Sequence, residues 1–153
     1  EVDLEIWAGA GTDRVEGGLG VDDLGGGADD DTFVLRAANA DAEIGVNAPT
    51  TSDVVLNFEQ SEMDVIETSK GPLTAGSDYA QRDNTSTDVV DFLAWADDRF
   101  GVGREVALET DVQGSGDAWM IIDENSSGAV DDGDIFAVLI GVGTGAINDG
   151  DFV

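Results

Sequence analysis

Three consecutive nonapeptides near the start of the chain repeat one order of glycine, aspartate and apolar residues. They cover 8–16, 17–25 and 26–34 and align without a gap, as AGAGTDRVE, GGLGVDDLG and GGADDDTFV. The second position is always Gly, the sixth is always Asp (Asp13, Asp22 and Asp31), and the eighth is always apolar (Val15, Leu24 and Phe33). Glycine permits turns with φ > 0, and the apolar residue points inward from a short strand. The pattern therefore predicts short strands joined by tight turns that present carboxylates.

This order resembles the G-G-x-G-x-D-x-U-x repeat of the RTX family. The resemblance implies a fold that is mainly β: a short parallel β-roll that binds calcium. Two positions depart from the pattern, with Ala8 at the first Gly of the first repeat and Asp29 at the fourth-position Gly of the third. Aspartate tolerates the left-handed backbone region, so Asp29 can serve the same turn.

The charge balance supports a role for cations. Six Lys and Arg residues face 34 Asp and Glu residues, for a net charge of -28, which disfavours nucleic acid as a partner. The chain has no His and no Cys, so any metal must be held by oxygen, and such ligands suit calcium. A salt-adapted surface would also be acidic, but it would spread its acids, whereas cation sites gather them at fixed spacing.

The resemblance also implies a ligand set. In RTX rolls two repeats complete one coil, so turns eighteen residues apart stack and share an ion. One turn supplies the carbonyls of positions two and four with its Asp, and the stacked turn supplies those of positions one and three with its Asp. Turns 8–13 and 26–31 then form one complete site, whose ligands are the carbonyls of Gly9, Gly11, Gly26 and Ala28 and the carboxylates of Asp13 and Asp31.

Two further sites are expected to be partial. Gly18, Gly20 and Asp22 form half of one, completed by Asp53 or by water, because the turn stacked below 17–22 has no Asp at its sixth position. Asp29 and Asp31 form another half site with the same closing segment. We therefore expect one firm calcium ion in the repeats and one or two weaker ones.

The residues that follow the repeats predict two more strands. The segment 35–52 lacks periodicity and is predicted to be a loop. DVVLNF (53–58) and MDVIETS (63–69) are β-branched runs separated by a polar turn. They resemble the segments after the last repeat in RTX metalloproteases and alginate epimerases, although Asn57 and Glu67 stand where those families usually have Asp.

The second half predicts a helix and three strands. The segment 70–86 is predicted to be a loop. Residues 87–100 place apolar side chains on one helical face, with Ser86 or Thr87 as the cap and Gly101 at the end. Trp95 on this helix is expected to be a partly buried packing residue.

Strands at 105–110, 118–123 and 135–140 are expected to form an antiparallel cap. The chain would then divide into 1–52, the roll and its following loop, and 53–153, the cap, within one folding unit.

An acidic segment at 123–134, DENSSGAVDDGD, follows the spacing of an EF-hand loop. Gly128 provides the turn, and the candidate ligands are Asp123, Asn125, Ser127, the carbonyl of Ala129, Asp131 and Asp134. No helices flank this segment. A plain acidic hairpin turn explains it equally well.

The resemblance implies a noncatalytic module of a larger exported bacterial protein. Such a module folds on calcium outside the cell, is secreted or held at the cell surface, and leaves by a type I apparatus with its ABC transporter. The ending NDGDFV resembles the C-terminal signal read by that apparatus. The alternative is a calcium-dependent polysaccharide-binding module, whereas no separate carboxylate pair suggests an enzyme. The sequence has no apolar run long enough to span a membrane.

Overall fold

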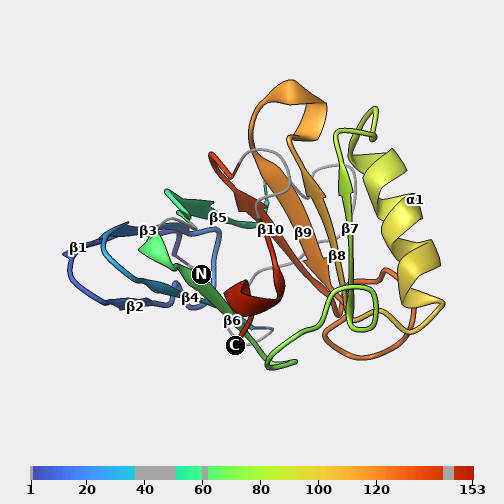
Figure 1. The fold of residues 1–153 in the computed structure, drawn as a ribbon, viewed down its shortest axis with the longest axis horizontal. Helices are drawn as coiled ribbons and strands as arrows, with labels where there is room; N and C mark the ends of the chain where they lie inside the picture. Colours follow the sequence, from blue (N-terminus) through green and yellow to red (C-terminus); the bar gives the residue numbers. More distant parts are fainter. Residues whose placement is uncertain (1, 37–50, 60–61, 143–146) are drawn as a thin grey trace.

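The computed structural model describes residues 2–36, 51–59, 62–142 and 147–153. It is mainly β, with one helix and both parallel and antiparallel strand pairs (Figure 1). The elements are β1 (Glu5–Ala10), β2 (Arg14–Val15), β3 (Asp23–Ala28), β4 (Thr32–Leu35), β5 (Asp53–Leu56), β6 (Val65–Thr68), β7 (Tyr79–Asp83), α1 (Val89–Phe100), β8 (Val106–Thr110), β9 (Ala118–Ile122) and β10 (Ile135–Leu139). Two short 3-10 turns cover Val112–Gly114 and Asp149–Asp151.

The repeats and the two strands after them form two parallel stacks. One stack has the order β1-β3-β5 and the other β2-β4-β6. Glu5 pairs with Asp23 and Arg14 with Thr32, so alternate repeats lie in register at a shift of eighteen residues. Each repeat therefore contributes a turn and a strand, and successive strands alternate between the stacks.

The segment after residue 52 belongs to the same stacks. β5 pairs with β3 on one edge and with β10 on the other, while β6 pairs with β4. Between 35 and 52, where a loop is predicted, β4 extends through Leu35 and residues 37–50 lie outside the described part. A boundary at 52/53 therefore falls inside a continuous sheet, because strand pairing continues from the repeats into the C-terminal half.

The large sheet has the order β1-β3-β5-β10-β9-β8-β7 (Figure 1). β10, β9 and β8 are antiparallel, and their positions confirm the three strands predicted there. The loop predicted for 70–86 is wrong in part, because β7 pairs in parallel with β8. The YAQRD sequence of β7 has weak strand propensity, so its strand depends on this tertiary pairing.

Both faces of the large sheet are buried in its C-terminal half. Leu108, Met120 and Ile122 pack with the repeat residues Leu24 and Phe33 on one side. On the other face, side chains of β8, β9 and β10 pack with Phe92 of the helix, and these are Ala107, Ile121, Phe136 and Val138. Strands buried on both faces are apolar at nearly every position, which explains the continuous runs in the sequence.

Helix α1 begins two residues later than predicted. Asp88, rather than Ser86 or Thr87, is the cap, and its carboxylate accepts a hydrogen bond from the Asp91 N–H. The helix ends at Phe100 with Gly101 as its C-cap, as expected. Trp95 is a partly buried packing residue, also as expected. No helix in the described part of the chain is long and apolar enough to cross a membrane.

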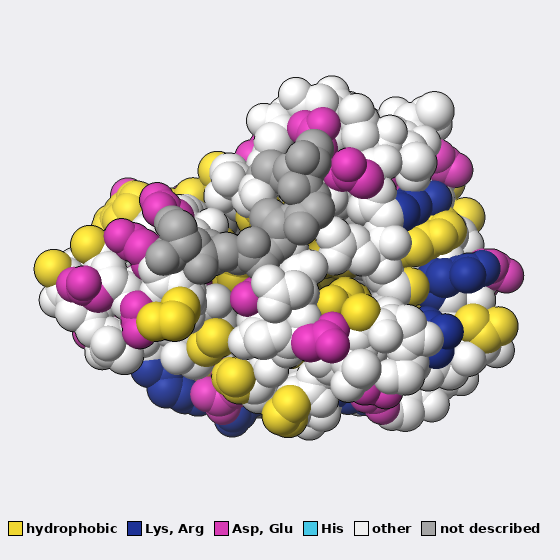
Figure 2. Space-filling model, in the orientation of Figure 1, with side chains coloured by type: hydrophobic (Ala, Val, Ile, Leu, Met, Phe, Trp, Pro, Cys, Tyr) yellow, Lys and Arg dark blue, Asp and Glu magenta, His cyan; other side chains and the backbone are white. Residues whose placement is uncertain are grey.

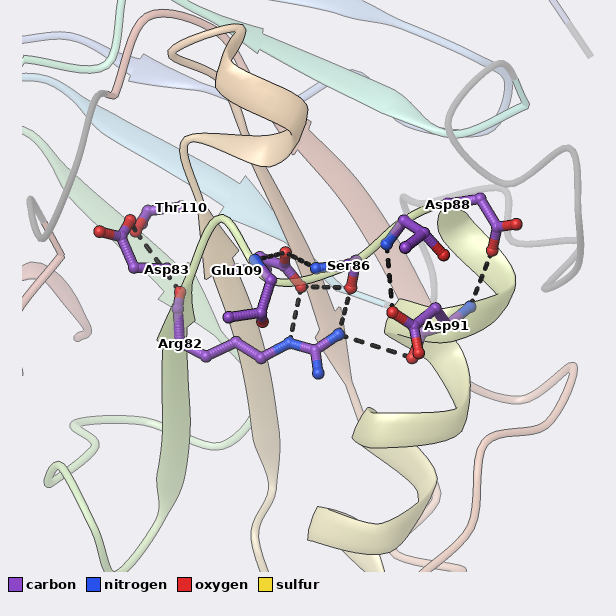
Figure 3. A network of polar contacts seen from close by, with 9 residues as sticks. Arg82, Asp83, Ser86, Asp88, Asp91, Glu109 and Thr110 are labelled. Atoms are coloured by element: carbon purple, nitrogen blue, oxygen red, sulfur yellow. Dashed lines mark hydrogen bonds and ion pairs between the residues drawn. The ribbon is translucent and has the colours of Figure 1, made fainter.

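A buried carboxylate joins β7, β8 and the start of α1 (Figure 3). Glu109 accepts hydrogen bonds from Arg82 Nε at 2.7 Å, from Thr85 N at 2.8 Å and from the backbone and hydroxyl of Ser86. Burial raises the pKa of Glu109, but these hydrogen bonds lower it by more, so the net shift is downward. Ser86 therefore forms hydrogen bonds with Glu109 and does not cap the helix, which was the role predicted for it.

Candidate metal centre

The turns between the strands have the backbone that the repeat requires. Positions two and four of all three repeats have positive φ, and these residues are Gly9, Gly11, Gly18, Gly20, Gly27 and Asp29. Asp29 has a φ of 76°, so it occupies the conformation expected of the glycine that it replaces. The turns therefore have the conformation that the repeat pattern predicts, which glycine adopts freely and aspartate tolerates.

The aspartates at position six stack in two columns. The strand register places Asp22 beside Asp53 in one column, and Asp13, Asp31 and Asp64 in the other. In both columns one carboxylate oxygen accepts a hydrogen bond from the backbone N–H of the turn before. The Asp13 N–H donates to Asp31 Oδ1 at 3.0 Å, and the Asp22 N–H donates to Asp53 Oδ1 at 3.0 Å.

The second oxygen of two of these carboxylates is buried and has no hydrogen-bond partner in the described residues. These atoms are Oδ2 of Asp22 and Oδ2 of Asp31. A side chain at Gly17 would place its Cβ 2.2 Å from the first atom, and one at Gly26 would place it 2.1 Å from the second. The first glycine of the repeat therefore makes room for the carboxylate. A buried, unpaired carboxylate oxygen is costly, so this donor set fits a bound cation.

The turns of the complete predicted site lie against each other. The carbonyl of Gly9 points at Gly27, where an added Cβ would lie 1.7 Å from its oxygen. The carbonyl of Ala28 accepts a hydrogen bond from the Gly11 N–H at 3.1 Å, which leaves its second lone pair. The structure therefore brings together the two halves from which Gly9, Gly11, Asp13, Gly26, Ala28 and Asp31 were predicted as ligands.

Electrostatics at Asp31 also favour a cation. Burial raises the pKa of Asp31, while the hydrogen bond from the Asp13 N–H lowers it. The nearby carboxylates of Asp64, Asp13 and Asp29 raise it further, and the net shift is upward. A positive ion between these groups would remove the repulsion that causes part of this shift.

The described residues contain no group of three or more carboxylates that could hold a metal ion. The predicted sites use two carboxylates per ion, with carbonyls completing the shell. At the predicted partial site, Asp53 stacks on Asp22, and both are almost fully buried. Gly20 in that turn lies close to Val2, whose carbonyl oxygen would be 2.7 Å from an added Cβ.

Two residues of the stacks were not predicted as site residues. Asp64 accepts hydrogen bonds from the Asp31 N–H at 2.9 Å and from the Glu59 N–H at 2.8 Å. Asn57 Nδ2 donates to the Gly27 carbonyl at 2.7 Å, and its Oδ1 is buried without a partner in the described part. The signal for Asp64 was present: an aspartate precedes a buried apolar residue by two positions at 13, 22, 31, 53 and 64.

The acidic segment 123–134 forms the hairpin loop between β9 and β10, and it gathers several predicted ligands. Asp123 accepts from the N–H groups of Ser127 and Gly128, both at 2.9 Å. Asn125 Nδ2 donates to Asp131 Oδ1 at 2.7 Å, while the Ser127 hydroxyl donates to the carbonyl of Ala129. Many of the polar groups of this loop therefore form hydrogen bonds with one another.

Asp134 is the exception in this loop. Its side chain is buried, Oδ2 accepts from the Asp131 N–H at 2.9 Å, and Oδ1 has no hydrogen-bond partner in the residues described. Burial is the main cause that raises its pKa to about 7, and repulsion from Asp123 and Asp131 adds to the shift.

Comparison of the sequence with protein-family models gives no match, and comparison with curated proteins gives no significant match.

Proposed function

We propose that the chain is a noncatalytic, calcium-binding RTX module whose two parallel stacks form a short β-roll. The observation that carries the proposal is the pair of buried aspartate oxygens, at Asp22 and Asp31, that lie beside the repeat glycines and have no hydrogen-bond partner among the described residues. The in-register shift of eighteen residues and the positive φ values at positions two and four support it. The lack of His and Cys restricts the metal to an oxygen-bound cation such as calcium.

In this proposal calcium controls folding. Bound ions neutralise the facing carboxylates and join neighbouring turns, so binding free energy becomes folding free energy. The first coil supports this view, because nearly all of β1 is exposed. The repeats bury less apolar surface than the C-terminal strands, so in this proposal they depend more on bound calcium ions for stability. We propose that the chain stays unfolded in the low calcium of the cytosol and folds outside the cell.

The proposed secretion signal is the C-terminal ending. Phe152 is buried against Tyr79, with ring centroids 5.2 Å apart, and the Val153 N–H donates to the Ile66 carbonyl at 3.0 Å. Asp151 and Phe152 are buried, so a transporter that contacts these two residues would have to do so before the chain folds. This order agrees with a chain that passes an ABC transporter unfolded and acquires calcium afterwards.

A calcium titration followed by far-UV circular dichroism tests the proposal. Wild type should gain β signal as calcium is added, whereas Asp13→Ala and Asp31→Ala should need more calcium for the same change. Asp23→Ala is the matched control, because it removes the same charge from an exposed position of β3. A chain fully folded in chelator, or mutants that titrate like wild type, would contradict the proposal.

The alternative proposal, a calcium-dependent polysaccharide-binding module, predicts a different result. Such a module should retain glycans on an array in calcium and release them in chelator. If the chain folds in calcium but retains no glycan, the polysaccharide-binding proposal is wrong and only the secretion role remains.

A further inference from the structure

A cavity of about 630 Å³ lies beside α1, on the side of the molecule away from the repeats. The described residues that line it come from β7, α1 and the neighbouring loops, and they include Tyr79, Arg82, Trp95, Arg99, Arg104 and Ile147. Figure 2 shows dark blue side chains gathered beside hydrophobic ones at this end of the molecule. Its volume lies within the range of sites for small organic ligands.

The charge of the lining is opposite to that of the chain. Three of the six basic residues line the cavity, whereas none of the described lining residues is Asp or Glu. Three acids that contact lining residues are not themselves part of the lining. Glu109 is fully buried behind Arg82, Asp98 pairs with Arg99, and Asp149 accepts from the Tyr79 hydroxyl and the Ala75 N–H.

Each arginine is held in place but keeps free donors. Arg82 donates Nε to Glu109 and Nη2 to the Ser86 hydroxyl and the Asp91 carbonyl, which leaves Nη1, and its guanidinium lies 4.4 Å from the centre of the Trp95 ring. Arg104 Nη1 donates to the Ser77 carbonyl at 2.6 Å, and Arg99 Nη2 pairs with Asp98. Arg99 Nε is buried and has no hydrogen-bond partner in the part of the chain described. Fixed guanidinium groups with spare donors are suited to carboxylate and sulfate groups.

We propose that this cavity binds a small organic anion that carries two or more carboxylate or sulfate groups on an apolar, ring-sized frame. The arginines supply the charge-assisted hydrogen bonds, and Tyr79, Trp95 and Ile147 supply the apolar and aromatic surface. The body of the protein repels anions at a net charge of -28, so only short-range contacts of this kind can hold one. None of the described lining residues is a predicted calcium ligand, so the two sites share no side chain.

A set of matched ring compounds tests the proposal by NMR titration of the folded protein in calcium-containing buffer. Benzene-1,3-dicarboxylate and benzene-1,3-disulfonate separate the two oxyanion sources, and benzene-1,3-dimethanol is the uncharged control. The dianions should shift the Nε–Hε signals of Arg82, Arg99 and Arg104 and the indole signal of Trp95 saturably. The uncharged compound should not.

Variants identify the residues responsible. Arg99→Gln combined with Arg104→Gln should weaken binding at least about tenfold, the loss expected for one charge-assisted hydrogen bond. Arg14→Gln is the control, because Arg14 lies on β2 and pairs with Glu16 and Glu67 away from the cavity. It should change the affinity by less than about twofold. Absence of saturable shifts up to about 10 mM dianion, or equal weakening by Arg14→Gln, would overturn the proposal.

Discussion

Single glycines decide whether the carboxylates of the repeats fit. Gly26 has no side chain, and a Cβ there would lie 2.1 Å from Asp31 Oδ2. Gly26→Ala should therefore lower the free energy of unfolding in calcium by about 1–3 kcal/mol, because the buried carboxylate cannot move without disturbing its hydrogen bond to the Asp13 N–H. Urea denaturation followed by circular dichroism measures this change.

The control for that prediction is Gly101→Ala, which removes a glycine where the nearest atom to the new Cβ is 3.4 Å away. Both changes reduce the freedom of the unfolded chain equally, so the difference between them isolates the clash. Equal urea midpoints for the two variants would show that Asp31 does not need the space beside Gly26.

At the scale of elements, the Glu109 network fixes where α1 begins relative to β7 and β8 (Figure 3). Glu109→Gln should destabilise the fold by about 2–4 kcal/mol, because Arg82 then keeps a partly buried charge without its counter-charge. Glu105→Gln, just before the same strand, makes the same chemical change at a carboxylate with no such network. It should alter stability by less than about 0.5 kcal/mol.

The same network predicts a pH dependence. The pKa of Glu109 is lowered on folding, so its stabilisation is complete above the usual glutamate pKa of about 4.3 and is lost as the pH falls through the lower folded value. The stability gap between wild type and Glu109→Gln should therefore narrow below about pH 4. A constant gap from about pH 6 to pH 3.5, measured by urea denaturation, would show that the carboxylate charge does not matter.

At the scale of the whole molecule, net charge opposes compaction. We expect chelation of calcium to raise the radius of gyration from about 15 Å toward about 40 Å, the values for a compact and an unfolded chain of this length. Small-angle X-ray scattering measures the change. Restoration of the compact state in chelator by about 1 M KCl would indicate general screening by salt and would contradict specific calcium sites.

Local patterns predicted much of the fold. The helix, the three C-terminal strands and the strands after the repeats follow from apolar periodicity, because each buries a face that its own residues define. β7 did not follow, since YAQRD becomes a strand only beside β8. Asp88 took the capping role from Ser86 because Ser86 binds Glu109, which lies 23 residues further along the chain.

Some residues of the candidate metal site were also predictable from the sequence, whereas others were found only in the structure. Spacing alone predicted the aspartates at 13, 22 and 31, because a fixed repeat places equivalent residues at equivalent points of each coil. Asp53 was predicted from the resemblance to segments that follow the last repeat in RTX proteins. Asp64 and Asn57 contact the third repeat through tertiary pairing, although the spacing between Asp64 and Ile66 already matched that of the other aspartates. The arginine-lined cavity likewise gathers residues from separate elements, which no local pattern records. The repeat turns, the helix and most strands thus follow from the sequence alone, because these depend on residues close together in the chain. β7 and the arginine-lined cavity follow only from the tertiary structure, because these depend on how distant segments pack together.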